Sequence, residues 1–152
     1  MKIIICILVL TSSNCFGCPK LEGKWNSSAS LTNKFNDQRA IIEEKTREFR
    51  SQLIGKSTTE YRNGKLIITM PPIEQVIISG KSYPWDSSEI RSKYTLLACT
   101  KNSVVIRYTV FGSTFISVLS FESSDVYWVY DGQVGGNGND HTREYFTRAK
   151  DH

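Results

Sequence analysis

Two histidines and a glycine-rich segment are the residues here most often associated with catalysis or phosphate binding. His141 follows Asp140, and His152 is the last residue. A histidine beside a carboxylate can form half of an acid–base pair, but no nucleophile, second carboxylate or set of metal ligands stands at a recognisable spacing from this one. The segment from Gly132 to Gly138 lacks the strand–loop–helix context of a phosphate cradle. We therefore expect no enzyme, no metal site and no cofactor, and a protein that acts by binding.

The first residues predict export. Lys2 is followed by an apolar run over residues 3–10 and then by Cys15-Phe16-Gly17, which is the order of regions in a signal peptide. The run is too short to span a bilayer, so no transmembrane segment is expected. Residues 1–17 are interpreted as the signal peptide and residues 18–152 as one domain, located in the periplasm or outside the cell.

Two cysteines remain after this cleavage, Cys18 and Cys99, and they allow two interpretations. An even number of cysteines in an exported domain favours a disulfide between them. The Gly17-Cys18 junction also fits a bacterial lipoprotein, in which Cys18 would carry a lipid anchor and Cys99 would stay reduced. The formal net charge of +4 comes from basic residues scattered among acidic ones, so no nucleic-acid partner is expected.

A short strand is predicted at residues 21–26, followed by one long amphipathic helix. Ser28, Ser30 and Thr32 are candidate N-caps, and Gly55 suits the residue after the helix end. The apolar residues at helical spacing predict that one face packs on the rest of the protein; they are Leu31, Phe35, Ile42, Phe49 and Leu53.

After Gly55 the pattern alternates with a period of two, which is typical of a sheet. Asn63-Gly64 predicts a type I′ hairpin turn, and Gly112-Ser113 suits a type II′ turn. Residues 80–88, which contain Tyr83-Pro84-Trp85, are expected to interrupt the strands as a loop. A sequential meander removes its edges by closing, so we predict a mainly β fold: an antiparallel up-and-down barrel of about eight or nine strands, with the helix after the first strand.

The alternation in the later strands offers two sets of inward-facing residues. The more uniformly apolar set contains Val104, Ile106, Tyr108 and Val110 with Phe115, Leu119 and Phe121; the opposite set contains Val105, Arg107, Phe111, Ile116 and Val118. We assign the first set to the interior and add Trp128 and Tyr130 from the next strand. The predicted ligand-binding residues are Ile106, Tyr108, Phe115, Leu119, Trp128 and Tyr130, which either line a cavity or fill the core.

Gly23-Lys24-Trp25 resembles the G-x-W motif on the first strand of lipocalins, and Ser124-Asp125-Val126-Tyr127 loosely resembles their late T-D-Y turn. Arg148 resembles the arginine that in lipocalins stacks over the first-strand tryptophan. The chain thus resembles small exported lipocalin-like, or calycin-type, barrels over nearly the whole of residues 18–152. The resemblance implies structural roles for Gly23, Trp25 and Arg148 at the closed end of the barrel.

Two functions remain open. The first is binding of a small hydrophobic ligand inside the barrel. The second is an exported protein-binding module, such as an inhibitor or an immunity-type protein, with a filled barrel and an exposed patch around Trp85 and Arg91.

Overall fold

The computed structural model describes residues 17–130 and 141–150. Almost all of the predicted signal peptide, the glycine-rich segment with Asp140, and His152 lie outside these residues. The elements of the described part, in chain order, are β1 (Gly23–Ser27), α1 (Ala29–Arg39), α2 (Glu44–Ser51), β2 (Thr58–Arg62), β3 (Lys65–Met70), β4 (Ile73–Ile78), β5 (Lys81–Trp85), β6 (Ser88–Thr100), β7 (Ser103–Val110), β8 (Ser113–Ser123), β9 (Val126–Tyr130) and β10 (Arg143–Arg148).

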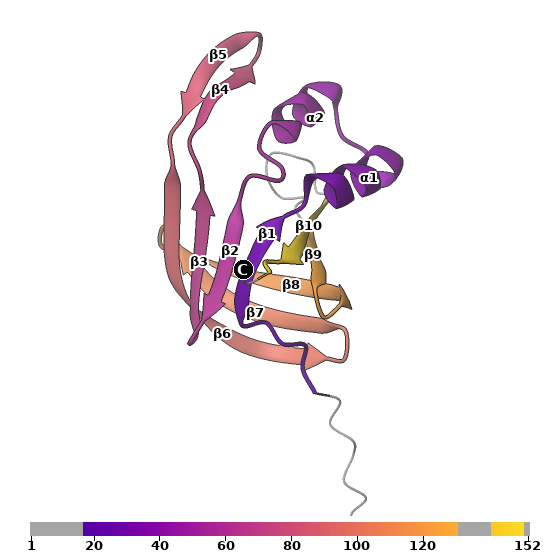
Figure 1. The fold of residues 1–152 in the computed structure, drawn as a ribbon, viewed down its shortest axis with the longest axis vertical. Helices are drawn as coiled ribbons and strands as arrows, with labels where there is room; N and C mark the ends of the chain where they lie inside the picture. Colours follow the sequence, from indigo (N-terminus) through magenta and orange to yellow (C-terminus); the bar gives the residue numbers. More distant parts are fainter. Residues whose placement is uncertain (1–16, 131–140, 151–152) are drawn as a thin grey trace, which may run out of the picture.

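Eight of these strands close into one antiparallel barrel in the order β1-β10-β9-β8-β7-β6-β3-β2. β4 and β5 form a separate two-stranded sheet, so β6 rather than β4 is the neighbour of β3. Figure 1 shows this β4–β5 ribbon projecting past the barrel at the end where the two helices lie. The predicted mainly β fold with a closed antiparallel barrel is confirmed.

The two predicted tight turns have different outcomes. Asn63 and Gly64 both have positive φ, at 51° and 71°, as a type I′ turn between β2 and β3 requires. The prediction for Gly112-Ser113 was wrong, because the positive φ values fall on Phe111, at 49°, and Gly112, at 79°. The turn therefore lies one residue earlier, and Ser113 already belongs to β8.

The predicted interruption over residues 80–88 was also wrong. Ser79 and Gly80, with φ of 51° and 77°, make a third tight turn, and β5 runs from Lys81 to Trp85. Pro84 has no N–H to donate, which excludes it from the middle of a sheet but not from an edge. In a two-stranded ribbon both strands are edges, so the proline is accommodated.

The single long helix predicted after the first strand is instead two short helices. Ala40 ends α1 with ψ of 138°, an extended conformation, and α2 begins at Glu44. The apolar pattern did not reveal this break, because the step of seven from Phe35 to Ile42 crosses it without losing the helical spacing. Of the three candidate N-caps, Ser28 caps the helix: its Oγ accepts a hydrogen bond from Leu31 N at 3.4 Å, while Ser30 and Thr32 lie within α1.

A disulfide joins Cys18 to Cys99 with a Cα–Cα distance of 5.5 Å, which confirms the predicted pairing. It ties the segment before β1 to the end of β6. The Cys18 sulfur that would carry a lipid anchor is thus bonded to Cys99.

Candidate functional site

One end of the barrel is closed by Trp25 and Arg148. The two residues lie opposite each other in the β1–β10 pair, and the guanidinium carbon is 4.2 Å from the centre of the indole, as the resemblance implies. The indole is fully buried, and its N–H donates to the carbonyl of Leu21 at 2.9 Å. Gly23 has φ of 125°, and a Cβ there would lie 2.9 Å from an Arg148 nitrogen. Only glycine fits beneath the arginine at this position.

Aromatic side chains fill the barrel next to this closed end. The Tyr127 ring lies 4.7 Å from Trp25 and stacks on Phe146 at 5.0 Å, between ring centres. Phe121 meets both Trp25 and Tyr127 at less than 6 Å. These rings belong to one buried cluster with Leu21, Tyr61, Leu66, Val104, Ile106 and Leu119. This half of the barrel is therefore packed by its own side chains.

Two phenols lie within this cluster. Burial raises the pKa of both the Tyr61 and Tyr127 hydroxyls well above the usual value for tyrosine, and their hydroxyls are hydrogen-bond neighbours. A hydrogen bond with Thr59 works in the opposite direction and lowers the pKa of Tyr127. Both phenols remain neutral at physiological pH, so the core carries hydroxyl groups without charge.

Of the predicted ligand residues, Ile106 and Leu119 belong to this solid core. They are 1% and 0% exposed, and both face inward as predicted. A ligand could reach them only by displacing other core residues. They are better described as the floor beneath a site than as its lining.

Tyr108 and Phe115 lie further along the same inner face. They oppose each other in the β7–β8 pair, and their rings stack at 5.7 Å. Tyr108 packs against the core cluster, and its hydroxyl lies 3.2 Å from Ser117 Oγ. Phe115 is nevertheless 43% exposed. An inward-facing ring with that much exposed surface marks a place where the described side chains leave the inner face uncovered.

The inward orientation predicted for Trp128 and Tyr130 was wrong. Their strand neighbours Tyr127 and Val129 are the ones that pack in the core, so Trp128 and Tyr130 face outward. The Arg143 guanidinium carbon lies 3.7 Å from the Trp128 ring centre and 4.1 Å from that of Phe35 on α1. Tyr130 is 61% exposed at the margin of this cluster.

The error arose because the alternation in β8 cannot be carried into β9 from sequence alone. The pairing shifts at an irregularity between Phe121 and Ser123, and one extra residue exchanges the two faces of every later position. Sequence reasoning missed three interior residues. The shifted pairing accounts for Tyr127 and Val129 on β9, and Tyr61 was missed because β2 was not assigned an inner face. Only knowledge of which residues surround Trp25 in the folded protein would have identified them.

The ribbon forms a second candidate site with α2. A cavity of about 530 Å³ lies between them and is lined by Lys45, Glu48, Phe49, Ser51, Gln52, Ile77, Ile78, Ser79 and Gly80. Gln52 holds the ribbon in place: its amide accepts from Ile77 N at 2.7 Å and donates to Ile77 O at 3.1 Å. Trp85 packs against Phe49 with 6.3 Å between ring centres, so it anchors the ribbon to α2, while Tyr83 is exposed.

Within residues 17–130 and 141–150, no group of three or more histidine, cysteine, aspartate or glutamate side chains could hold a metal ion. The helices of this part of the chain are too short or too polar to cross a membrane. His141 is exposed, with φ of 49°.

The closed eight-stranded barrel is compatible with a calycin-type fold. No family model matches the chain, and neither does any curated protein or solved structure.

Proposed function

We propose that this protein is an exported binding protein that takes a small hydrophobic ligand on the inner face of the barrel, at Tyr108 and Phe115. The observation that carries the proposal is the exposed surface of Phe115 on the face that elsewhere forms the core. Stacked aromatic rings beside a few hydroxyls, here Tyr108 and Ser117, are typical of sites for small apolar molecules. The buried core below the pair gives the site a rigid base.

The disulfide supports export. A bond between Cys18 and Cys99 persists in an oxidising compartment and is rarely kept in the cytosol. The intact mass of the protein from its natural source tests both cleavage before Cys18 and formation of the disulfide, which removes two hydrogens. A mass that retains residues 1–17, or that carries acyl chains, contradicts this part of the proposal.

Adjacent residues on β8 provide a matched test of the ligand site. Phe115 faces inward, whereas Ile116 pairs with Arg107 on the outer face and is 64% exposed. We expect Phe115→Ala to weaken binding of the neutral probe N-phenyl-naphthylamine about tenfold, because the lost aromatic contact corresponds to about 1.5 kcal/mol. Ile116→Ala should leave the affinity unchanged, as measured by fluorescence titration.

A second candidate is a protein-binding module, favoured by apolar side chains on the outer wall. Leu97 on β6 and Ile116 and Val118 on β8 are each at least 45% exposed, on the two strands that flank β7. If Ile116→Ala lowers probe affinity while Phe115→Ala does not, the outer wall is the binding surface and the ligand proposal fails. Failure of the wild-type protein to bind any neutral lipophilic probe also contradicts it.

A further inference from the structure

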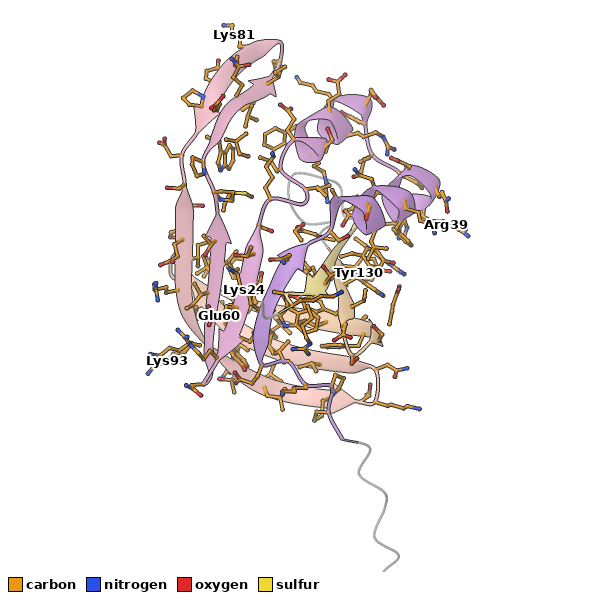
Figure 2. All side chains as sticks on the ribbon, in the orientation of Figure 1. Lys24, Arg39, Glu60, Lys81, Lys93 and Tyr130 are labelled. Carbon is orange, nitrogen blue, oxygen red and sulfur yellow. A yellow bond between two sulfur atoms is a disulfide. The ribbon has the colours of Figure 1, made fainter. Side chains whose placement is uncertain are left out.

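Three cations lie in one row across the outer wall of the barrel. Arg62 on β2 opposes Lys65 on β3, and Lys65 opposes Lys93 on β6. Arg62 has an ion pair with Glu60 at 3.3 Å, but no ion pair among the described residues engages Lys65 or Lys93. Figure 2 shows Lys93 projecting away from the barrel. Like charges directly opposite each other destabilise a sheet, so this row favours an anionic partner.

A shallow hollow lies among these cations. It measures about 280 Å³ and is lined by Lys65, Ile67, Arg91, Ser92 and Lys93. Ile67 is only 8% exposed although its strand partners are Glu60 and Arg91, so the charged side chains stand over an apolar residue. A hollow of this size, with ammonium groups around it, fits a phosphate headgroup.

Phe111 stands beside this row at the turn between β7 and β8. Its side chain is 93% exposed, and its φ of 49° is a conformation that bulky residues rarely adopt. The end of β7 that leads into this turn is bonded to the residue next to Lys93, because Thr109 N donates to Ser92 Oγ at 3.2 Å. Neither packing nor backbone geometry favours a phenylalanine here, so its ring is available for contact outside the molecule.

We propose that Arg62, Lys65, Lys93 and Phe111 form a surface that docks on an anionic lipid bilayer. An exposed aromatic ring enters the interface between headgroups and acyl chains, and neighbouring cations bind the headgroup phosphates. A protein partner would need a pocket that encloses the whole ring, whereas a bilayer deforms around it. The positive charge of the row is complementary to an anionic bilayer surface, and the projecting turn with Phe111 can reach that surface first.

Vesicle co-sedimentation of the disulfide-bonded protein tests this surface. The vesicles are pure phosphatidylcholine, or phosphatidylcholine with about 30% phosphatidylglycerol. We expect binding to the anionic vesicles only, and weaker binding as salt is added. Lys65→Gln with Lys93→Gln should lower the partition coefficient about 30-fold, because each lysine near an anionic surface contributes about 1 kcal/mol of binding free energy. Phe111→Ser should lower it about fivefold.

Matched controls lie on the helices and the segment between them. Lys34→Gln with Lys45→Gln removes the same charge from α1 and α2. Ile41→Ser removes an apolar side chain that is 73% exposed and lies between the two helices. The controls should bind like the wild-type protein. Phe115→Ala should also bind vesicles normally, which separates this surface from the proposed ligand site.

Four results would overturn the proposal: equal binding to neutral vesicles, no binding to anionic ones, equal losses in the control variants, or no loss in the Lys65/Lys93 and Phe111 variants. Inorganic phosphate at millimolar concentration distinguishes the source of the anion. If it shifts the amide resonances around Lys65 and Lys93 while vesicles do not bind, the hollow is a site for free phosphate and the membrane proposal fails.

Discussion

The Arg148 guanidinium donates hydrogen bonds to the carbonyls of Lys20, Glu22 and Ser124, at 2.6, 2.8 and 3.1 Å, while its face lies on the Trp25 ring. Three carbonyls from two separate chain segments thus converge on one planar group. A lysine has the same charge but a single ammonium, which cannot reach three carbonyls and cover an indole together. The closed end of the barrel depends on the shape of the arginine as well as on its charge.

We expect Arg148→Lys to lower the free energy of unfolding by about 2 kcal/mol, because charge-assisted hydrogen bonds to carbonyls are lost. Urea unfolding followed by tryptophan fluorescence measures this change. Arg62→Lys is the control, because Arg62 is an exposed residue with one surface ion pair, and it should change stability by less than about 0.5 kcal/mol. Equal stability of the two variants would show that the arginine is not needed at the closed end.

The buried phenols predict a loss of stability at alkaline pH. Because burial raises the pKa of Tyr61 and Tyr127, the folded protein keeps both protons above pH 10, where the unfolded chain releases them. The folded state then binds more protons, so the free energy of unfolding falls as pH rises above about 10, by up to about 1.4 kcal/mol per pH unit for each phenol. Below about pH 10 this contribution is fully present.

Tyr127→Phe should reduce that alkaline slope, which thermal unfolding between about pH 9 and pH 11 measures. Tyr83→Phe, at an exposed ribbon residue, should leave the slope unchanged. An identical slope in wild type and Tyr127→Phe would mean that Tyr127 ionises in the folded state as readily as in the unfolded chain.

Among the elements, α1 takes the place of a neighbouring strand beside β10, beyond the point where the β1–β10 pairing ends. The Asn36 amide donates to Arg143 O and accepts from Arg143 N, both at 3.0 Å, and Thr32 Oγ1 accepts from Tyr145 N at 2.9 Å. These side chains replace the bonds of a neighbouring strand. The buried face of α1 is therefore polar, at Thr32 and Asn36, and hydrophobic spacing could not identify it.

Asn36→Leu should lower the free energy of unfolding by about 2 kcal/mol, because it leaves the N–H and carbonyl of Arg143 without partners. It should also speed hydrogen exchange at the Arg143 amide, which NMR detects. Asn33→Leu, three residues earlier on α1 and only partly buried, is the control. Unchanged exchange at Arg143 in the Asn36 variant would show that water or another group satisfies that N–H equally well.

Sequence patterns located the strands and the closed end better than they located the site. Turn residues such as Asn63-Gly64 act through local geometry, which a sequence contains, and the contact of Trp25 with Arg148 was implied by the resemblance to lipocalins. The break at Ala40 and the face of Trp128 depend on tertiary contacts and on a local irregularity in β8–β9 pairing, which a sequence does not show. Four of the six predicted ligand residues therefore lie on the inner face, as a floor or a stacked pair, while Trp128 and Tyr130 lie outside.

At the scale of the whole molecule, the disulfide links the segment before β1 to β6 across 81 positions of sequence. Closing a loop of that length reduces the entropy of the unfolded chain and stabilises the fold by about 4 kcal/mol. We expect the double variant Cys18→Ser with Cys99→Ser to unfold at a correspondingly lower urea concentration. The wild-type protein in reducing agent should behave like this variant, and a midpoint unchanged in both would contradict the prediction.

The proposed ligand site of this protein is the inner face of the barrel, at Phe115. Intermolecular nuclear Overhauser effects between bound N-phenyl-naphthylamine and the protein test it most directly. We expect contacts from the probe to the rings of Phe115 and Tyr108 and none to the methyl groups of Ile116. Contacts to Ile116 and Val118 without any to Phe115 would place the ligand on the outer wall and contradict it.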